Sequence, residues 1–152
     1  MPTLSELRAS PLASLEALYR DAPLAPAPSG CFRGHVLARV DNRLARGLLG
    51  DAMVGPFEWL PFGIDFARSA WFFVHPSLRL GKFRAEAGPS RWRDTEVLRL
   101  TYDESRLPPP VHGLLYDELK PLSETLCLGL GGINTGPGKG DLFFFALEPF
   151  AP

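Results

Sequence analysis

The segment that most constrains the fold is the run Leu142-Phe143-Phe144-Phe145-Ala146-Leu147, near the end of the 152-residue chain. Successive side chains of a β-strand point to opposite faces of the sheet, so a strand with one face in water alternates between apolar and polar residues. This run does not alternate, and both of its faces must therefore be covered by other parts of the protein. A barrel with a helix on its outside satisfies this requirement, because the core covers the inner face and the helix covers the outer one.

An amphipathic segment near the N-terminus provides the outer cover. Leu12, Leu15 and Leu18 fall on one stripe at helical spacing. Ser10, followed by a proline, is placed to cap the start of this helix. Pro23 predicts its end, because proline disfavours helical geometry at the residue before it. We therefore expect this helix to pack against the outer face of the apolar strand.

From residue 30 onward the sequence has the period of two that is typical of β-strands. Alternation or composition predicts strands over the segments 32–40, 71–74, 80–86, 95–103, 124–133 and 141–147. A glycine-rich loop over 131–140 joins the last two as a hairpin. The stretch 111–119 fits either a strand or a helix. A short helix is expected through Leu44, Leu48 and Leu49, with Gly50 at its end.

These segments predict a mainly β, antiparallel fold in one domain, 1–152. Strands at this spacing, with turn signals between them, favour a barrel of roughly eight strands over a parallel α/β sheet. The N-terminal helix and its proline-rich connector occupy residues 1–29, and the barrel occupies residues 30–148.

Charge and cysteine content limit the partners and the compartment. The net charge is −1 and no basic stripe is present, which argues against nucleic acid as a partner. The apolar runs are shorter than the ~20 residues needed to span a membrane as a helix, so no membrane span is expected. Cys31 and Cys127 occur without a visible export signal and are expected to be reduced, which indicates a cytoplasmic protein.

No motif for a phosphate or a metal is present. The loop 131–140 fails the phosphate-loop pattern, because Ile133 stands where glycine is required and Gly140 where serine or threonine is required. The three histidines are far apart in sequence, so no metal site is predicted. A single axial ligand to haem leaves no spacing pattern, which keeps His35 and His75 as candidates for that role alone.

Three residues are candidates for acid–base chemistry: Asp117, Tyr102 and Lys82. If residues 111–119 form a strand, Asp117 shares a face with Leu115 and Leu119. Burial among leucines would raise the pKa of its carboxyl group, as general acids and bases require. The alternative is that Asp117 forms an ion pair or caps a turn.

Aromatic and aliphatic residues along the predicted strands are candidates to line a ligand pocket. They are Phe32, Trp59, Trp71, Phe83, Leu98, Leu100, Tyr102 and Tyr116. Tyr102 is expected to supply a polar contact in an otherwise apolar lumen. The aromatic segment 57–73 contains two prolines, so part of it is expected to be a loop that either plugs one end of the barrel or forms a lid.

Several short motifs resemble those of lipocalin-like (calycin) barrels. They are Gly30-Cys31-Phe32, where the family has Gly-x-Trp, then Leu80-Gly81-Lys82-Phe83, Tyr102-Asp103, Asp117-Glu118-Leu119 and Leu128-Gly129. The chain is similar in these motifs to small bacterial members of that superfamily. The resemblance implies a barrel that holds an apolar ligand, without implying which ligand or whether a reaction occurs.

Three functions are consistent with these features. The first is binding of a small apolar molecule, such as a fatty acid, an isoprenoid or a polyketide, inside the barrel. The second is an isomerase or cyclase that uses Tyr102, Lys82 or Asp117 as acid–base groups. The third is a barrel filled by its own side chains that serves as a structural or interaction domain.

Overall fold

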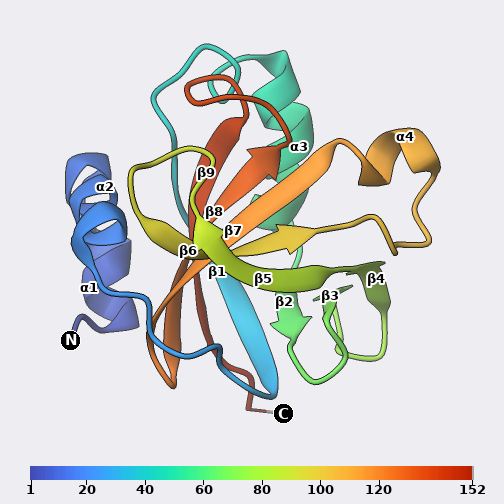
Figure 1. The fold of residues 1–152 in the computed structure, drawn as a ribbon, viewed down its shortest axis with the longest axis horizontal. Coiled ribbons are helices and arrows are strands. Elements are labelled where there is room, and N and C mark those ends of the chain that lie inside the picture. Colours follow the sequence, from blue (N-terminus) through green and yellow to red (C-terminus); the bar gives the residue numbers. More distant parts are fainter. Residues whose placement is uncertain (152) are drawn as a thin grey trace.

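The fold is seen in a computed structural model that describes residues 1–151 (Figure 1). Nine antiparallel strands form one sheet that curls into a nearly closed barrel. In chain order they are β1 (Cys31–Arg39), β2 (Phe62–Asp65), β3 (Ala70–Phe73), β4 (Arg79–Lys82), β5 (Arg84–Pro89), β6 (Glu96–Thr101), β7 (Leu115–Ser123), β8 (Leu126–Ile133) and β9 (Asp141–Pro149). Their order in the sheet is β4-β3-β2-β1-β9-β8-β7-β6-β5.

Four helices accompany the barrel. They are α1 (Leu4–Ala9), α2 (Leu12–Asp21), α3 (Leu48–Trp59) and α4 (Pro109–His112). The first two lie together on one side of the barrel, and α3 packs against β1 and β9 near one end of it (Figure 1). No helix in residues 1–151 is long and apolar enough to cross a membrane.

The barrel closes where one stretch of chain passes from one edge of the sheet to the other. β4 and β5 stand at opposite ends of the strand order, yet only Phe83 separates them in sequence. β4 pairs with β3 and β5 pairs with β6. The segment 80–86, predicted as a single strand, is therefore divided at Phe83. This division and the short strand β2, which was not predicted, bring the number of strands to nine, where roughly eight were expected.

The apolar strand β9 is covered on both faces, as its sequence requires. Phe143 lines the barrel cavity, and Phe145, two residues along on the same face of β9, packs against Trp71. Phe144 points outward and meets Tyr19 of α2 edge to face, with ring centroids 5.6 Å apart. The prediction that the N-terminal helix covers this strand is confirmed.

Polar contacts hold α2 in this position. Arg93 donates two hydrogen bonds of 2.7 Å to Glu16 of α2 and one of 2.8 Å to the buried Asp141 of β9. Glu118, fully buried on the outer face of β7, accepts from the Tyr19 hydroxyl at 2.8 Å and from the Tyr116 hydroxyl at 2.9 Å. Because each buried charge has several partners, the helix is docked by a satisfied polar network as well as by apolar packing.

Some boundaries differ from the sequence-based expectation. Ser10 does not cap α2: it follows α1, and its hydroxyl donates to the Glu6 carbonyl, so Pro11 takes the N-cap position. Gly50 does not end the helix that was expected through Leu44, Leu48 and Leu49. That helix is α3, which begins at Leu48 and continues to Trp59. β2 was not predicted. The ambiguous stretch 111–119 contains the end of α4 and then the start of β7.

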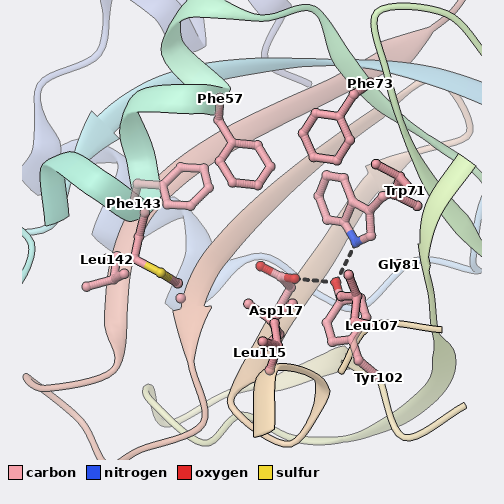
Figure 2. A pocket seen from close by; sticks show the side chains of 14 residues that line it. Phe57, Trp71, Phe73, Gly81, Tyr102, Leu107, Leu115, Asp117, Leu142 and Phe143 are labelled. Carbon is pink, nitrogen blue, oxygen red and sulfur yellow. Dashed lines mark hydrogen bonds between the residues drawn. The ribbon is translucent and has the colours of Figure 1, made fainter. Parts of the chain in front are cut away.

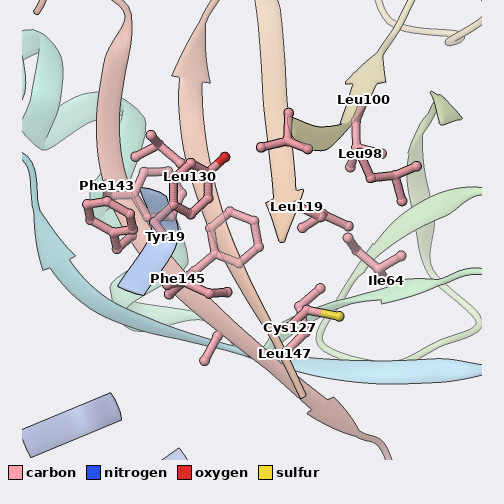
Figure 3. Packing of buried hydrophobic residues seen from close by; sticks show 14 of the residues in the cluster. Tyr19, Ile64, Leu98, Leu100, Leu119, Cys127, Leu130, Phe143, Phe145 and Leu147 are labelled. Carbon is pink, nitrogen blue, oxygen red and sulfur yellow. The ribbon is translucent and has the colours of Figure 1, made fainter. Parts of the chain in front are cut away.

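Much of the barrel interior is filled by side chains (Figure 3). Leu98 and Leu100 of β6, Leu119 of β7 and Ile64 of β2 are all buried and belong to one apolar cluster. Phe145 packs directly over Gly129, where an added Cβ would lie 2.1 Å from its ring. The space left for a ligand is therefore confined to one end of the barrel.

Candidate functional site

A cavity of about 260 Å³ lies at the end of the barrel beside α3 (Figure 2). It is lined by Met53, Phe57, Trp71, Phe73, Leu80, Gly81, Tyr102, Leu107, Val111, Leu115, Asp117, Gly132, Leu142 and Phe143. Among these side chains, nitrogen or oxygen atoms occur only in Trp71, Tyr102 and Asp117. The cavity is thus apolar except for one cluster of polar groups.

Phe57 of α3 forms the aromatic wall of this cavity. Its ring contacts those of Phe62, Trp71, Phe73 and Phe143, at centroid separations from 5.1 to 6.1 Å. The segment 57–73, expected in part to be a loop that plugs the barrel or forms a lid, instead contains the end of α3 and the strands β2 and β3, and Phe57 at the helix end packs over the cavity. The remaining lining comes from Met53, which is also on α3, from the strands, from Tyr102 just after β6 and from the 107–111 segment.

The three polar groups form one hydrogen-bonded chain. The indole N–H of Trp71 donates to the Tyr102 hydroxyl, which in turn donates to Asp117 Oδ2 (Figure 2). An indole N–H can only donate a hydrogen bond. The Tyr102 oxygen therefore accepts from Trp71, and the single proton of the Tyr102 hydroxyl points to Asp117. The direction of every hydrogen bond in the chain is therefore determined.

The sheet brings these residues together from both of its edges. Leu100 of β6 is paired with Asp117 of β7, and Tyr102 follows Leu100 by two residues on the same face. Diagonal neighbours of this kind are close enough for a long aromatic side chain to reach across. Trp71 comes from β3, near the opposite edge of the sheet, so its bond to Tyr102 crosses the barrel interior.

Burial changes the acid–base properties of this chain. Desolvation raises the pKa of the Asp117 carboxyl from 3.8 to about 7, although hydrogen bonds from Tyr102 and the Gly132 backbone partly oppose the rise. Desolvation and the neighbouring Asp117 charge raise the pKa of Tyr102 well above 10. At neutral pH, Asp117 therefore populates both protonation states while Tyr102 stays a neutral donor.

The structure places three of the predicted site residues together and separates the others. Trp71, Tyr102 and Asp117 line the cavity. Lys82 does not join them: its side chain is exposed, with Nζ 3.9 Å from Glu104 Oε2. Lys82 points outward because it alternates with Gly81, which lines the cavity.

The remaining predicted lining residues lie elsewhere. Phe32, Phe83, Leu98 and Leu100 are buried in the filled part of the core and do not line the cavity. Tyr116 is on the outer face of β7, where its ring meets Trp92 edge to face at 5.0 Å. Trp59, at the end of α3, is 86% exposed.

The histidines considered for haem do not line the cavity either. His35 lies on β1 and hydrogen-bonds to Arg8 at 2.6 Å and to Glu148 at 2.8 Å. His75 is exposed and contacts Ser77. Within residues 1–151, no group of three or more His, Cys, Asp or Glu side chains is arranged to hold a metal ion.

Sequence reasoning did not assign several lining residues to the cavity. Leu107 and Val111 belong to the segment between β6 and β7, where three consecutive prolines hide any periodicity. Met53 lies beyond Gly50, in the part of α3 that was not expected to be helical. On this side of the cavity, the sequence indicated only Tyr102 and the face that Asp117 shares with Leu115.

The comparisons with known proteins agree with the fold and go no further. No family model and no curated protein matches the sequence. Among solved structures, a protein from Thermomonospora curvata is similar, with 19% sequence identity and a TM-score of 0.51 over 93% of this chain and 89% of that chain. At this identity the likeness shows a shared fold alone. It gives no lipocalin assignment.

Proposed function

We propose that the protein binds a small, mainly apolar molecule in the cavity at the end of the barrel, as a lipocalin-like carrier would. The observation that carries the proposal is an apolar cavity with a single polar cluster, Asp117 with Tyr102 and Trp71. Binding sites for small molecules combine apolar walls with a few polar groups that orient the ligand in this way.

The cavity volume limits the size of the molecule. At ~30 Å³ for the volume of one water, about 260 Å³ accommodates on the order of ten non-hydrogen atoms. A short acyl chain, a small isoprenoid or a single aromatic ring system fits this space. A long fatty acid would extend out of the cavity, so the shorter members of the three ligand classes are favoured.

The polar cluster predicts one further property of the ligand. Asp117 is only partly accessible, through the cavity, and desolvation of its charge is offset by few partners. A ligand hydroxyl or amine that donates to the carboxylate would add a partner for its charge. We therefore expect the ligand to carry one hydrogen-bonding group at its buried end.

A binding experiment with a matched pair of variants tests the proposal. The neutral fluorophore 1-aminonaphthalene should bind with increased emission, because it is small, apolar and carries one donor. Val111→Trp fills the cavity from its rim and should abolish binding. Leu114→Trp, three residues away at an exposed position that does not line the cavity, should leave binding intact. Equal binding to both variants would contradict the proposal.

A second candidate function is acid–base catalysis in the same cavity. It is favoured by the Asp117 pKa of about 7, which allows the carboxyl group both to take and to give a proton at neutral pH. In D₂O, the Asp117 carboxylate would take a proton from the carbon next to a ketone carbonyl and leave an enolate; the carboxyl proton would exchange with the solvent, and Asp117 would return a deuteron to the same carbon. Deuterium incorporation into 4-phenyl-2-butanone, followed by mass spectrometry, should fall by roughly 10²–10⁴ in Asp117→Asn and be unchanged in Asp103→Asn.

The two cysteines support the proposed compartment. Cys31 and Cys127 are both free, although they lie in strands of the same barrel. Reduced thiols are usual in the cytoplasm, where disulfides are rare. We keep the cytoplasm as the proposed location on this ground.

A further inference from the structure

A basic surface groove adjoins the apolar cavity. It has a volume of about 650 Å³ and lies between β3, β4 and the loop that follows β6. Four cationic side chains line it: Arg68, Arg79, Lys82 and Arg106. We call this surface the basic groove.

The carboxylates in the groove do not neutralise these cations. Asp65, which is buried, contacts Arg68 at 3.2 Å and Arg79 at 3.5 Å. Glu104 lies 3.9 Å from Lys82, near the limit for an ion pair. Arg106 forms no ion pair with any residue of the described chain, 1–151. Four positive and two negative charges leave a net charge of +2 on a protein whose overall charge is −1.

The basic groove borders the cavity. Leu80, Gly81 and Leu107 line both spaces, so the groove and the cavity adjoin at these three residues. Gly81 has a positive φ of +76° and carries no side chain to divide them. A molecule that spans the two spaces would pass Leu80, Gly81 and Leu107.

The two spaces differ in the charge they accept. The cavity ends at a carboxyl group in apolar surroundings, which disfavours a buried anion. The groove has a surplus of arginine and lysine, and guanidinium groups bind carboxylates well. An amphiphilic molecule with an acid at one end therefore has one favourable orientation, with the acid outward.

We propose that the ligand is an anionic amphiphile, with its apolar body in the cavity and a carboxylate or similar acidic group held in the basic groove by Arg106 and Lys82. This inference rests on the proposed binding function and adds the chemical class of the ligand. The buried end carries the hydroxyl or amine that meets Asp117. The acidic end provides a partner for Arg106 and competes with Glu104 for Lys82.

A pair of probes that differ only at the outer end tests this inference. 8-Hydroxyoctanoate and 1,8-octanediol share the apolar body and the hydroxyl for Asp117, but only the former carries an acid. Their dissociation constants are measured by displacement of 1-aminonaphthalene at low and high salt. We expect the acid to bind about tenfold more tightly at low salt, and this advantage to shrink as salt screens the groove.

Charge-matched variants separate the groove from a general charge effect. Lys82→Gln with Arg106→Gln should remove the tenfold advantage of the acid and leave diol binding unchanged. Arg20→Gln with Arg46→Gln, two exposed cations on α2 and beyond β1, makes the same change in net charge and should leave both constants unchanged.

Each outcome decides between the two proposals. Diol binding with no preference for the acid, or a preference that survives loss of Lys82 and Arg106, would overturn the anionic-ligand inference and leave the proposed function standing. Failure of both probes and of 1-aminonaphthalene to bind the native protein would overturn both. An equal loss of both probes in the groove variant, with an unchanged melting temperature, would also reject a specific role for the acid.

Discussion

At the residue scale, Asp117 combines a cost in stability with the chemistry of the site. Its carboxyl group is surrounded by apolar cavity walls, and only Tyr102 among the side chains hydrogen-bonds to it. Carboxyl groups without strong partners are usually excluded from such surroundings. A buried carboxyl group that is costly when ionised is the kind of residue that the proposed ligand would contact.

The cost of Asp117 should appear as a pH dependence of folding. The unfolded chain loses this proton near pH ~4, whereas the folded protein keeps it up to about pH 7. Stability from this group is therefore complete below pH ~4 and is lost as pH rises to about 7, a decrease of roughly 4 kcal/mol at most. Asp117→Asn should remove this part of the slope, as measured by urea unfolding over that pH range. Asp103→Asn, an exposed control, should retain it, and equal slopes in all three proteins would count against a buried acid.

Gly34 should be intolerant of even one added methyl group. A Cβ at this position would lie 2.1 Å from the ring of Phe62, which is itself packed against Phe57 and Trp71. Gly34→Ala should therefore destabilise the protein by about 1–3 kcal/mol through overpacking. Gly136→Ala, in a loop with no atom within 4 Å of the added Cβ, should stay within about 0.5 kcal/mol. Denaturant unfolding of the two variants gives the comparison.

At the element scale, α2 acts as part of the barrel wall. Leu15 and Tyr19 are buried on one side of the helix, while Glu16 binds Arg93, which also binds Asp141 of β9. These contacts hold the helix over strands that have no polar face. Without α2, Phe144 would stand in water, and a flat apolar strand surface of that kind promotes aggregation.

Leu15→Ala measures how much this packing contributes. Leu15 is 1% exposed, so its truncation should cost roughly 2–5 kcal/mol of unfolding free energy. Leu48→Ala makes the same change at a side chain that is 88% exposed and should cost less than about 0.5 kcal/mol. A small effect at Leu15, measured by thermal and denaturant unfolding, would mean that the polar contacts alone hold α2.

Sequence patterns predicted the strands in which one pattern of apolar residues, either alternating or continuous, extends over the whole element. β1, β6 and β9 were found because alternation or unbroken apolarity extends over at least six residues. β2 was missed because Phe62–Asp65 is short and buried on both faces, so it has no period to detect. Gly50 misled the prediction of α3, since it sits inside the helix where an added Cβ would be 2.1 Å from the Ala45 carbonyl oxygen.

At the scale of the whole molecule, the candidate site depends on barrel closure, which single-strand patterns do not encode. Tyr102 and Asp117 were each candidates, and the β6–β7 register makes them diagonal neighbours. Trp71 joins them only because β3 curves round to face β6 across the interior. Lys82 lies outside because it alternates with Gly81 along β4, which a strand pattern alone can indicate. The sequence therefore identified Tyr102 and Asp117 as candidate site residues. It did not show that they contact Trp71, because that contact depends on the curvature of the whole sheet.

The two edge strands of the sheet, β4 and β5, meet at a seam that should be the first part of the barrel to open. Each of these strands pairs on one side only, whereas β8 pairs on both sides and is buried along its whole length. Backbone hydrogen bonds at an edge are lost in small local openings, and those in the centre require nearly complete unfolding. Amides in 79–89 should exchange with D₂O much faster than those in 126–133, as measured by mass spectrometry.

A ligand that spans the cavity and the basic groove contacts Leu80 and Gly81, so it should slow exchange at the seam and leave β8 unchanged. Equal protection of β4 and β8 in the free protein would mean that the barrel is closed by contacts stronger than the Trp71–Tyr102 bond and the single bond from Phe83 N–H to the Ser69 carbonyl.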